Sequence, residues 1–280
     1  MPELPEVETV RRTLEQLVAR KTVERVTVTL PRIVRRPPEP EAFARALEGC
    51  MIERVERRGK FLKFVFDGLV LVSHLRMEGR YGLYRTEDPV EKHTHVRFAF
   101  TDGTELRYRD VRQFGTMDLF RPGEEERDGP LSRLGWEPLS EAFTFEAFRK
   151  SISGRPAKIK PLLLNQKFVA GIGNIYADES LHSAGIHPER AAASLKAKEL
   201  RLLHESIRHI LANAVESGGS SVKSFVFGQG EQGAYQNRLN VYGRKGLPCK
   251  TCGEPIVKLV VGGRGTHICP RCQRQPASKK

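Results

Sequence analysis

The sequence has no apolar run long enough to cross a bilayer, and its N-terminus has no basic-then-apolar leader. A membrane-spanning helix needs roughly 18 or more consecutive apolar residues, and a secretory signal needs both parts of that leader. We therefore expect a soluble, cytoplasmic protein without a membrane partner. Cysteine is also scarce, with 5 residues in 280. Four of the five lie close together near the C-terminus, which excludes a disulfide scaffold and indicates a metal site.

Positive charge, by contrast, is in excess. Lys and Arg number 47 against 34 Asp and Glu, so the formal net charge is +13 and the pI is near 9.7. The basic residues are spread along the whole chain instead of forming one tail. Such an excess is typical of proteins that bind polyanions, above all nucleic acid. Charge alone leaves open the alternative of a basic protein that has no such partner.

Length and periodicity predict an α+β protein with two domains. The chain is longer than most single domains, and its hydrophobic content of 39% is enough for real cores. Apolar residues recur at helical spacing from about Pro5, whereas residues 22–30 and 51–109 have strand patterns, although Val23 is out of phase. Asp67-Gly68 and Asp102-Gly103 are typical hairpin turns. Helical spacing returns in four later stretches, which are residues 143–152, 159–164, 174–183 and 197–215.

This pattern predicts four parts and a tail. Residues 1–125 form an N-terminal β-sandwich with flanking helices, and residues 126–140, rich in turn signals, form a linker. Residues 141–238 form a helical domain, residues 239–274 form a C-terminal ribbon, and residues 275–280 are a polar tail. Within the helical domain, residues 217–238 are rich in Gly and Gln and are interpreted as a loop.

The strongest local motif is a pair of Cys-x-x-Cys sequences, separated by residues 253–268. Four thiolates at this spacing predict one structural Zn²⁺ with a closed tetrahedral shell, held by Cys249, Cys252, Cys269 and Cys272. The intervening residues are predicted to form a hairpin whose glycine-rich tip carries Arg264. An arginine on such a turn can reach a phosphate, although a solvated surface arginine is the alternative. Cys50 is interpreted as a buried thiol.

The N-terminal hexapeptide, residues 1–6, offers a nucleophile. We expect the initiator Met1 to be removed because Pro2 is small, which leaves a secondary amine. Such an amine attacks an aldehyde to give an iminium ion, and that cation is an electron sink. The dipole of the following helix disfavours protonation of the amine, and Glu3 lies beside it. The alternative is ordinary capping, since Pro and Glu are both common at the start of a helix.

The N-terminal Pro-Glu-Leu-Pro-Glu and the C-terminal zinc ribbon together resemble the bacterial formamidopyrimidine-DNA glycosylase family. The similarity runs from residue 2 to about residue 274. Its further motifs are the lysine loop at residues 57–61, intercalation loops at 73–79 and 110–115, and a helix–two-turn–helix at 171–179. Leu4 separates the chain from the endonuclease VIII branch, which typically has glycine there. Gln113 departs from the expected Lys or Arg.

The resemblance implies a role for each matching residue. Pro2 would attack C1′ of the damaged nucleotide, Glu3 would be the general acid–base, and Lys60 and Arg264 would bind phosphate and assist elimination. An apolar wedge and an arginine would fill the space left by the extruded nucleotide; these are Met77, Arg112 and Phe114. The remaining candidate DNA contacts are His74, His93, Asn174 and Arg155, the last in a basic cluster with Lys158 and Lys160. Residues 217–238 would close over the base.

The implied activity is base excision repair by a bifunctional glycosylase and lyase. It would release 8-oxoguanine and formamidopyrimidines from duplex DNA through a Schiff base and then cleave the strand by β,δ-elimination. The implied enzyme is a monomer at the bacterial nucleoid. One alternative is an endonuclease VIII-like enzyme for oxidised pyrimidines, which Leu4 and the loop at 112–114 disfavour. The other is a non-catalytic zinc-ribbon DNA-binding protein, which would explain the charge and the cysteines but not Pro2, Glu3 or Lys60.

Overall fold

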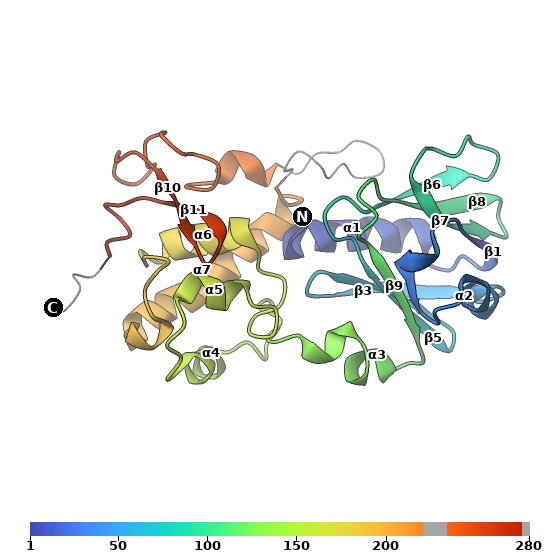
Figure 1. Cartoon of the computed structure of the whole chain (residues 1–280), viewed down its shortest axis with the longest axis horizontal. Coiled ribbons are helices and arrows are strands. Elements are labelled where there is room, and N and C mark those ends of the chain that lie inside the picture. The colour runs from blue at the N-terminus through green and yellow to red at the C-terminus, as the bar shows by residue number, and fades with distance from the viewer. Residues whose placement is uncertain (221–233, 276–280) are drawn as a thin grey trace. The chain divides into compact units, whose positions relative to one another are not determined.

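The computed structural model describes residues 1–220 and 234–275, which divide into two compact units (Figure 1). The first comprises Met1–Ser132 with Gly218–Gly233, and the second comprises Arg133–Ser217 with Ala234–Lys280. Each unit has its own hydrophobic core. Residues 221–233 of the predicted closing loop and 276–280 of the predicted tail lie outside the described residues. Within the described ranges, no helix is both long and apolar enough to span a membrane.

The first unit is the predicted β-sandwich. One sheet has the strand order β1-β7-β8-β6 and the other has the order β2-β9-β5-β4-β3. The first sheet consists of β1 (Val23–Val28), β6 (Arg80–Arg85), β7 (Thr94–Phe100) and β8 (Thr104–Arg109). The second consists of β2 (Val34–Arg36), β3 (Ile52–Arg58), β4 (Phe61–Phe66), β5 (Leu69–His74) and β9 (Thr116–Phe120). The facing rings of Phe64 and Tyr81 lie 5.4 Å apart, so the apolar faces of the two sheets share one core.

Three helices and two 3₁₀ turns accompany these sheets, namely α1 (Leu4–Val18), α2 (Pro40–Leu47), α3 (Glu124–Arg127), η1 (Pro31–Ile33) and η2 (Pro130–Arg133). α1 begins one residue before the predicted start and packs its apolar face against β3. The phase error at Val23 has a physical cause. A register shift between Val23 and Arg25 lets Val23 and Val26 both point into the core.

The second unit is helical with one small hairpin. Its helices are α4 (Phe145–Ile152), α5 (Ile159–Leu164), α6 (Asn174–Ser183) and α7 (Ala197–Glu216), with 3₁₀ turns η3 (Ala192–Ser194) and η4 (Tyr235–Arg238). α6 is the central element, since it is buried from Ile175 to His182 and contacts α5, α7 and β11. The hairpin pairs β10 (Val257–Val261) with β11 (Arg264–Ile268). Its tip is therefore only Gly262-Gly263, and Arg264 is the first residue of β11, not part of the turn as predicted.

Candidate functional site

The start of α1 holds the predicted nucleophile and acid–base group. Glu3 is the N-cap residue, and its side chain accepts a hydrogen bond from the N–H of Glu6. Glu6 reciprocates, because its Oε2 accepts from the N–H of Glu3 at 2.8 Å. Both side chains are only 3% exposed, and Pro2 is buried as well. Glu3 therefore caps the helix, which keeps its carboxylate at the start of α1 next to Pro2 in the chain, and its catalytic role stays a prediction. The Oε1 atom of Glu6 also accepts from the N–H of Ser220 at 2.7 Å.

Lys60 lies in the tight turn between β3 and β4, where Gly59 has a φ of +57°. Arg57 braces this turn by donating from Nη1 to the Gly59 carbonyl at 2.9 Å and from Nε to Glu8 of α1 at 3.0 Å. Burial opposes ionisation of Glu8, but Arg57 and Arg11 hold its pKa below the usual value. The lysine turn and the helix that follows Pro2 are therefore tied together by a charged hydrogen bond.

His74 lies at the end of β5, opposite Phe61, and its ring meets the Phe61 ring edge-on at 4.4 Å. Its Nδ1 accepts from the N–H of Arg76 at 2.9 Å, so the neutral ring carries its proton on Nε2. Burial and the nearby Arg76, Lys60 and Arg35 lower its pKa to about 3. His74 is consequently a neutral donor suited to a phosphate oxygen. Arg35 was missed because it lies on β2, a strand without a sequence signal.

The three predicted space-filling side chains are all at the surface of the first unit. Met77 is 36% exposed and Phe114 is 52% exposed. The Arg112 guanidinium lies 5.1 Å from the centre of the Phe114 ring, so the two side chains form one cation–π pair. The alternative in which Met77 and Phe114 are core residues is therefore wrong. An exposed apolar wedge with an arginine beside it can enter a base stack.

A buried carboxylate shapes the loop of Arg112 and Phe114. Asp110 is 1% exposed, and its Oδ2 accepts from the backbone N–H of Phe114 at 2.9 Å and of Gly115 at 2.8 Å. The Tyr108 hydroxyl lies under both loops. A Cβ atom on Gly79 would approach it to 2.2 Å, and one on Gly115 to 1.7 Å. Sequence reasoning gave Asp110 and Tyr108 no role because the bonds that reveal them appear only in the folded loop.

Three residues in or near these loops have a left-handed backbone, namely Arg76 with φ of +55°, His93 with φ of +69° and Gln113 with φ of +60°. The His93 carbonyl accepts from the N–H of Asp110 at 3.0 Å, which joins His93 to the base of the Arg112 loop. Gln113 accepts a hydrogen bond from Arg32 through Oε1. Gln113, where the resemblance led us to expect Lys or Arg, thus orients the neighbouring Arg32.

The four clustered cysteines of the second unit fit a zinc ion. Their sulfur atoms all lie within 4.8 Å of one another. Individual Sγ–Sγ distances are 3.4 Å for Cys252–Cys269, 3.5 Å for Cys252–Cys272 and 4.0 Å for Cys249–Cys272. A tetrahedral Zn²⁺ with bonds of about 2.3 Å separates its sulfurs by about 3.8 Å. The geometry therefore suits a closed structural site.

Residues outside the cluster hold these ligands in place. His182 of α6 places Nε2 3.5 Å from Cys249 Sγ, and Gln273, 1% exposed, accepts from the N–H of Cys269 at 3.1 Å. Burial opposes ionisation of Cys249, but the Thr251 N–H and His182 lower its pKa to about 6. His182 of α6 is therefore an outer partner that contacts the Cys249 sulfur.

The basic cluster before α6 contains three different environments. Arg155 is exposed, and its guanidinium lies 5.5 Å from the centre of the Phe168 ring. Lys158 forms a surface ion pair with Glu189 at 2.5 Å. Lys160 is 0% exposed. Only Arg155 and Lys158 of the three are therefore placed to touch DNA, which narrows the choice that the sequence left open.

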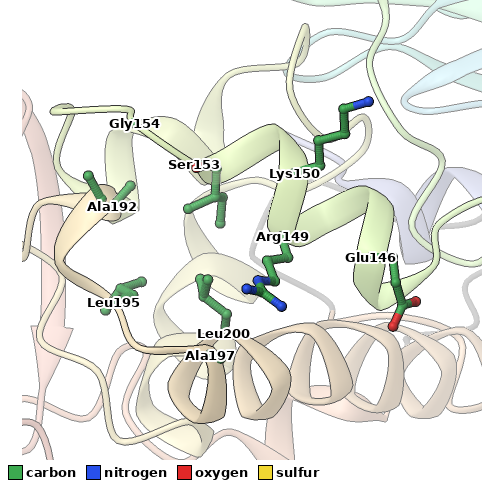
Figure 2. Close-up of a pocket in the computed structure, with 11 residues that line it drawn as sticks. Glu146, Arg149, Lys150, Ser153, Gly154, Ala192, Leu195, Ala197 and Leu200 are labelled. Atoms are coloured by element: carbon green, nitrogen blue, oxygen red, sulfur yellow. The ribbon is translucent and has the colours of Figure 1, made fainter.

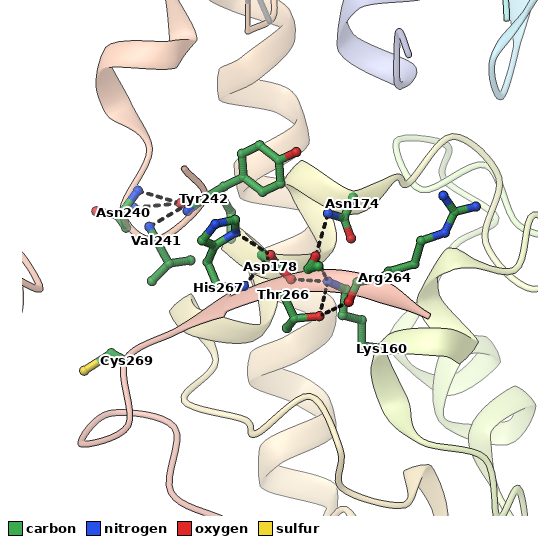
Figure 3. A network of polar contacts seen from close by, with 12 residues as sticks. Lys160, Asn174, Asp178, Asn240, Val241, Tyr242, Arg264, Thr266, His267 and Cys269 are labelled. Atoms are coloured by element: carbon green, nitrogen blue, oxygen red, sulfur yellow. Dashed lines mark hydrogen bonds and ion pairs between the residues drawn. The ribbon is translucent and has the colours of Figure 1, made fainter. Parts of the chain in front are cut away.

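Asn174 and Arg264, the other predicted DNA contacts of this unit, are joined through the hairpin (Figure 3). Asn174 is the first residue of α6, and its Nδ2 donates to the Gly265 carbonyl at 2.8 Å. Arg264 is exposed beside Gly265. Further along α6, the Glu179 carboxylate accepts from the three backbone N–H groups of residues 240–242, each at 2.9 Å. The sequence placed Glu179 in the helix–two-turn–helix motif but did not indicate that it anchors residues 240–242.

A hollow of about 470 Å³ opens between the end of α4 and the start of α7 (Figure 2). The exposed Arg149 and the apolar Leu195 and Leu200 are among its lining residues. None of the predicted site residues lines it. We therefore assign it no part in the reaction.

Three family models match the chain in order. They are the formamidopyrimidine-DNA glycosylase N-terminal domain at residues 1–117, the formamidopyrimidine-DNA glycosylase H2TH domain at 134–226, and the zinc finger found in FPG and IleRS at 246–275. The helix–two-turn–helix and the zinc ribbon predicted from the sequence are thereby confirmed. With the four thiols, the last match also confirms the predicted zinc site.

Relatives named formamidopyrimidine-DNA glycosylase match over nearly their whole length. The Brevibacillus brevis protein is 63% identical over 98% of this chain and 99% of its own, and the Bacillus subtilis protein is 55% identical with the same coverage. Solved structures of Lactococcus lactis Fpg each cover 98% of this chain and 100% of their own. They contain Fapy-dG DNA (TM-score 0.90, 43% identity), abasic-site DNA (0.90, 42%) and oxidised-pyrimidine DNA (0.91, 43%). On sequence, domain order and fold together, this chain belongs to the formamidopyrimidine-DNA glycosylase family.

Proposed function

We propose that this chain excises oxidised purines, namely 8-oxoguanine and formamidopyrimidines, from duplex DNA and then cleaves the abasic strand. The observation that carries the proposal is the buried start of α1, where the cap holds Glu3 next to Pro2. Complexes of a Lactococcus lactis relative with Fapy-dG and abasic-site DNA support the substrate class. The net charge of +13 suits a DNA partner.

Base loss needs Glu3 and the Pro2 nitrogen, once Met1 has been removed. Glu3 delivers a proton to O4′, and the C1′–O4′ bond breaks to open the sugar ring. The lone pair of Pro2 attacks C1′, the C1′–N bond to the base breaks, and the base leaves with that electron pair and the proton that the Pro2 nitrogen gives up. This leaves an iminium ion on Pro2. Loss of a C2′ proton expels the 3′ phosphate, and a second elimination expels the 5′ phosphate. Lys60 and Arg264 bind these phosphates as their charge develops.

The zinc ion has a structural role in this scheme. When bound, it would crosslink four thiolates and leave no open coordination position. The two cysteine pairs flank the β10–β11 hairpin, so their crosslink fastens the hairpin and therefore holds Arg264. We also propose that the enzyme acts as a monomer at the nucleoid, since one chain supplies every assigned group. Light scattering of its complex with a lesion duplex tests the stoichiometry, and a mass of two chains per duplex would contradict it.

Substrate choice provides the direct test of this function. Single-turnover excision of 8-oxoguanine opposite cytosine should be fast, and borohydride should trap the chain on that duplex. A second candidate, the release of oxidised pyrimidines, is favoured by the Lactococcus lactis complex with oxidised-pyrimidine DNA. Faster excision of thymine glycol than of 8-oxoguanine would make it the main activity. Failure to trap on either duplex would overturn both proposals.

Met77→Ala should impair extrusion of the base and spare bond breaking. We expect excision from an intact lesion pair to slow by about tenfold, equivalent to about 1.4 kcal/mol of lost compensation for unstacking. Cleavage at a preformed abasic site should change little, because little base remains to be extruded. Met77 is 36% exposed, so the variant should keep its thermal stability. Equal losses on the two substrates would contradict this role.

Glu3→Gln should separate the two activities. The amide oxygen can still accept from the Glu6 N–H, so the helix cap and the fold should survive. It cannot transfer a proton, and excision of the intact base should slow by about 100-fold or more. The lyase step on abasic DNA should keep much of its rate, because the Pro2 amine is untouched. Parallel loss of both steps in a folded variant would assign Glu3 a different role.

A further inference from the structure

An ion pair lies in the interior of the second unit, below the predicted DNA contacts. Lys160 of α5 and Asp178 of α6 approach to 2.6 Å between Nζ and Oδ1, and both side chains are 0% exposed. Burial of two charges carries a large desolvation cost, so a buried pair is poor evidence of stabilisation unless further hydrogen bonds satisfy it. The position of those further bonds indicates what the pair does.

The further bonds go to the hairpin, in the three residues that follow Arg264. Lys160 donates from Nζ to the Gly265 carbonyl at 3.1 Å and to the Thr266 hydroxyl at 2.7 Å. Asp178 Oδ2 accepts from the N–H of His267 at 2.9 Å. Figure 3 shows these bonds converging on neighbouring residues near the start of β11. The ion pair thus fixes the backbone at the start of β11.

Two of the predicted DNA contacts, Asn174 and Arg264, are bonded to the same part of β11. Asn174 donates to the Gly265 carbonyl that also accepts from Lys160. Thr266 Oγ1, which accepts from Lys160, donates to the Arg264 carbonyl at 2.9 Å. Asn174 and Lys160 thus share the Gly265 carbonyl as an acceptor, and the Thr266 hydroxyl links Lys160 to the Arg264 carbonyl. Both predicted DNA ligands are therefore connected to the buried pair through β11. A shift of the pair would move Asn174 and Arg264 together.

We propose that the Lys160–Asp178 pair is a positioning device that sets Arg264 and Asn174 at a fixed spacing for adjacent backbone phosphates. The proposal rests on the proposed function, because it assigns the pair to the grip on lesion DNA. Lys160 belongs to this device and does not itself contact DNA. The reaction rate depends on such positioning, since a displacement of about 1 Å in a group that holds the substrate can slow the reaction by about 100-fold.

The main test removes both charges at once. Either single substitution leaves one buried charge unpaired and is expected to destabilise the fold. Lys160→Met combined with Asp178→Asn avoids this, and the asparagine keeps an acceptor for the His267 N–H. Single-turnover excision by the double variant should be about tenfold slower or worse. Lys198→Met, the same change at an exposed site in this unit, should excise at the parent rate.

A mutant cycle separates positioning from general damage. If the pair acts through Arg264 and Asn174, then adding Lys160→Met and Asp178→Asn to a chain that already carries Arg264→Ala and Asn174→Ala should slow excision little further. Additive losses, or full activity in the double variant, would overturn the proposal. Thr266→Val provides a second route, because it removes only the hydroxyl that links Lys160 to Arg264. Thr266→Val should slow excision by itself but should add little to the loss caused by Arg264→Ala. Additive losses in the combined variant would again overturn the proposal.

The readouts keep this proposal distinct from the proposed function. Borohydride trapping on abasic DNA reports the Pro2 amine, and every folded variant should retain it. Loss of trapping in the parent chain would refute the proposed function itself. Normal trapping in the parent chain, with an unchanged excision rate in the double variant, would refute only the role of Lys160 and Asp178.

Discussion

A chain that retains Met1 should lose both base excision and strand cleavage, by more than about 10⁴-fold, which is the scale of removing a nucleophile. With Met1 in place, the Pro2 nitrogen is a tertiary amide without a reactive lone pair. Removal of Met1 turns the same atom into a secondary amine at the start of α1. An α-amino group titrates near pH 7.7–8.0, and the positive end of the helix disfavours its protonation. The free amine is then available at neutral pH.

The measurement compares chains with free and blocked N-termini. Borohydride cross-linking to a lesion duplex, followed by peptide mapping, should place the adduct on Pro2 in the processed chain and detect none in a chain with an uncleavable N-terminal tag. Both chains should bind the duplex alike, because phosphate contacts supply most of the affinity. An adduct on Lys60, or one that persists in the tagged chain, would mean that the start of α1 only caps the helix.

Local sequence signals predicted the secondary structure best where residues such as glycine mark the boundary of an element. The ends of α5 and α6 were predicted to the residue, and glycines at 171 and 173 mark the start of α6. β9 was missed, and β6 was not separated as a strand of its own within the predicted β stretch of residues 51–109. Each follows an intercalation loop, and each is specified by pairing with distant strands, β6 with β8 and β9 with β5. Such non-local pairing leaves little trace in a short window of sequence.

The residues of the site likewise fall into those that the sequence could identify and those that it could not. Motifs identified the groups meant to meet DNA, such as Pro2 and Arg264, because their chemistry is visible in the residue type and its neighbours. They did not identify the buried groups that hold those residues. Lys160 looked like one of three surface cations, yet its partner Thr266 lies 106 positions later. Burial and long-range hydrogen bonds decide its role, and neither can be inferred from spacing.

Cys272→Ser should release the zinc ion and abolish binding to lesion DNA. Three thiolates and a hydroxyl make a poor Zn²⁺ site, so zinc content should fall from about one ion per chain toward zero. The apolar cluster around the ribbon has only Val241, Ile256, Cys249 and Cys269 as fully buried members. So small a core cannot fold the ribbon alone, and metal binding is then part of its folding free energy. Without zinc, the hairpin loses its hold on Arg264.

The chain contains its own control. Cys50→Ser makes the same chemical change outside the cluster and should alter neither zinc content nor DNA affinity. His182→Ala keeps all four ligands and removes only the contact to Cys249. Its affinity for zinc should fall by about 10- to 100-fold, so a chelator should remove the ion at a lower concentration than from the parent chain. It should bind DNA normally when zinc is in excess. Full DNA affinity in metal-free Cys272→Ser would show that the helices hold Arg264 without the ribbon.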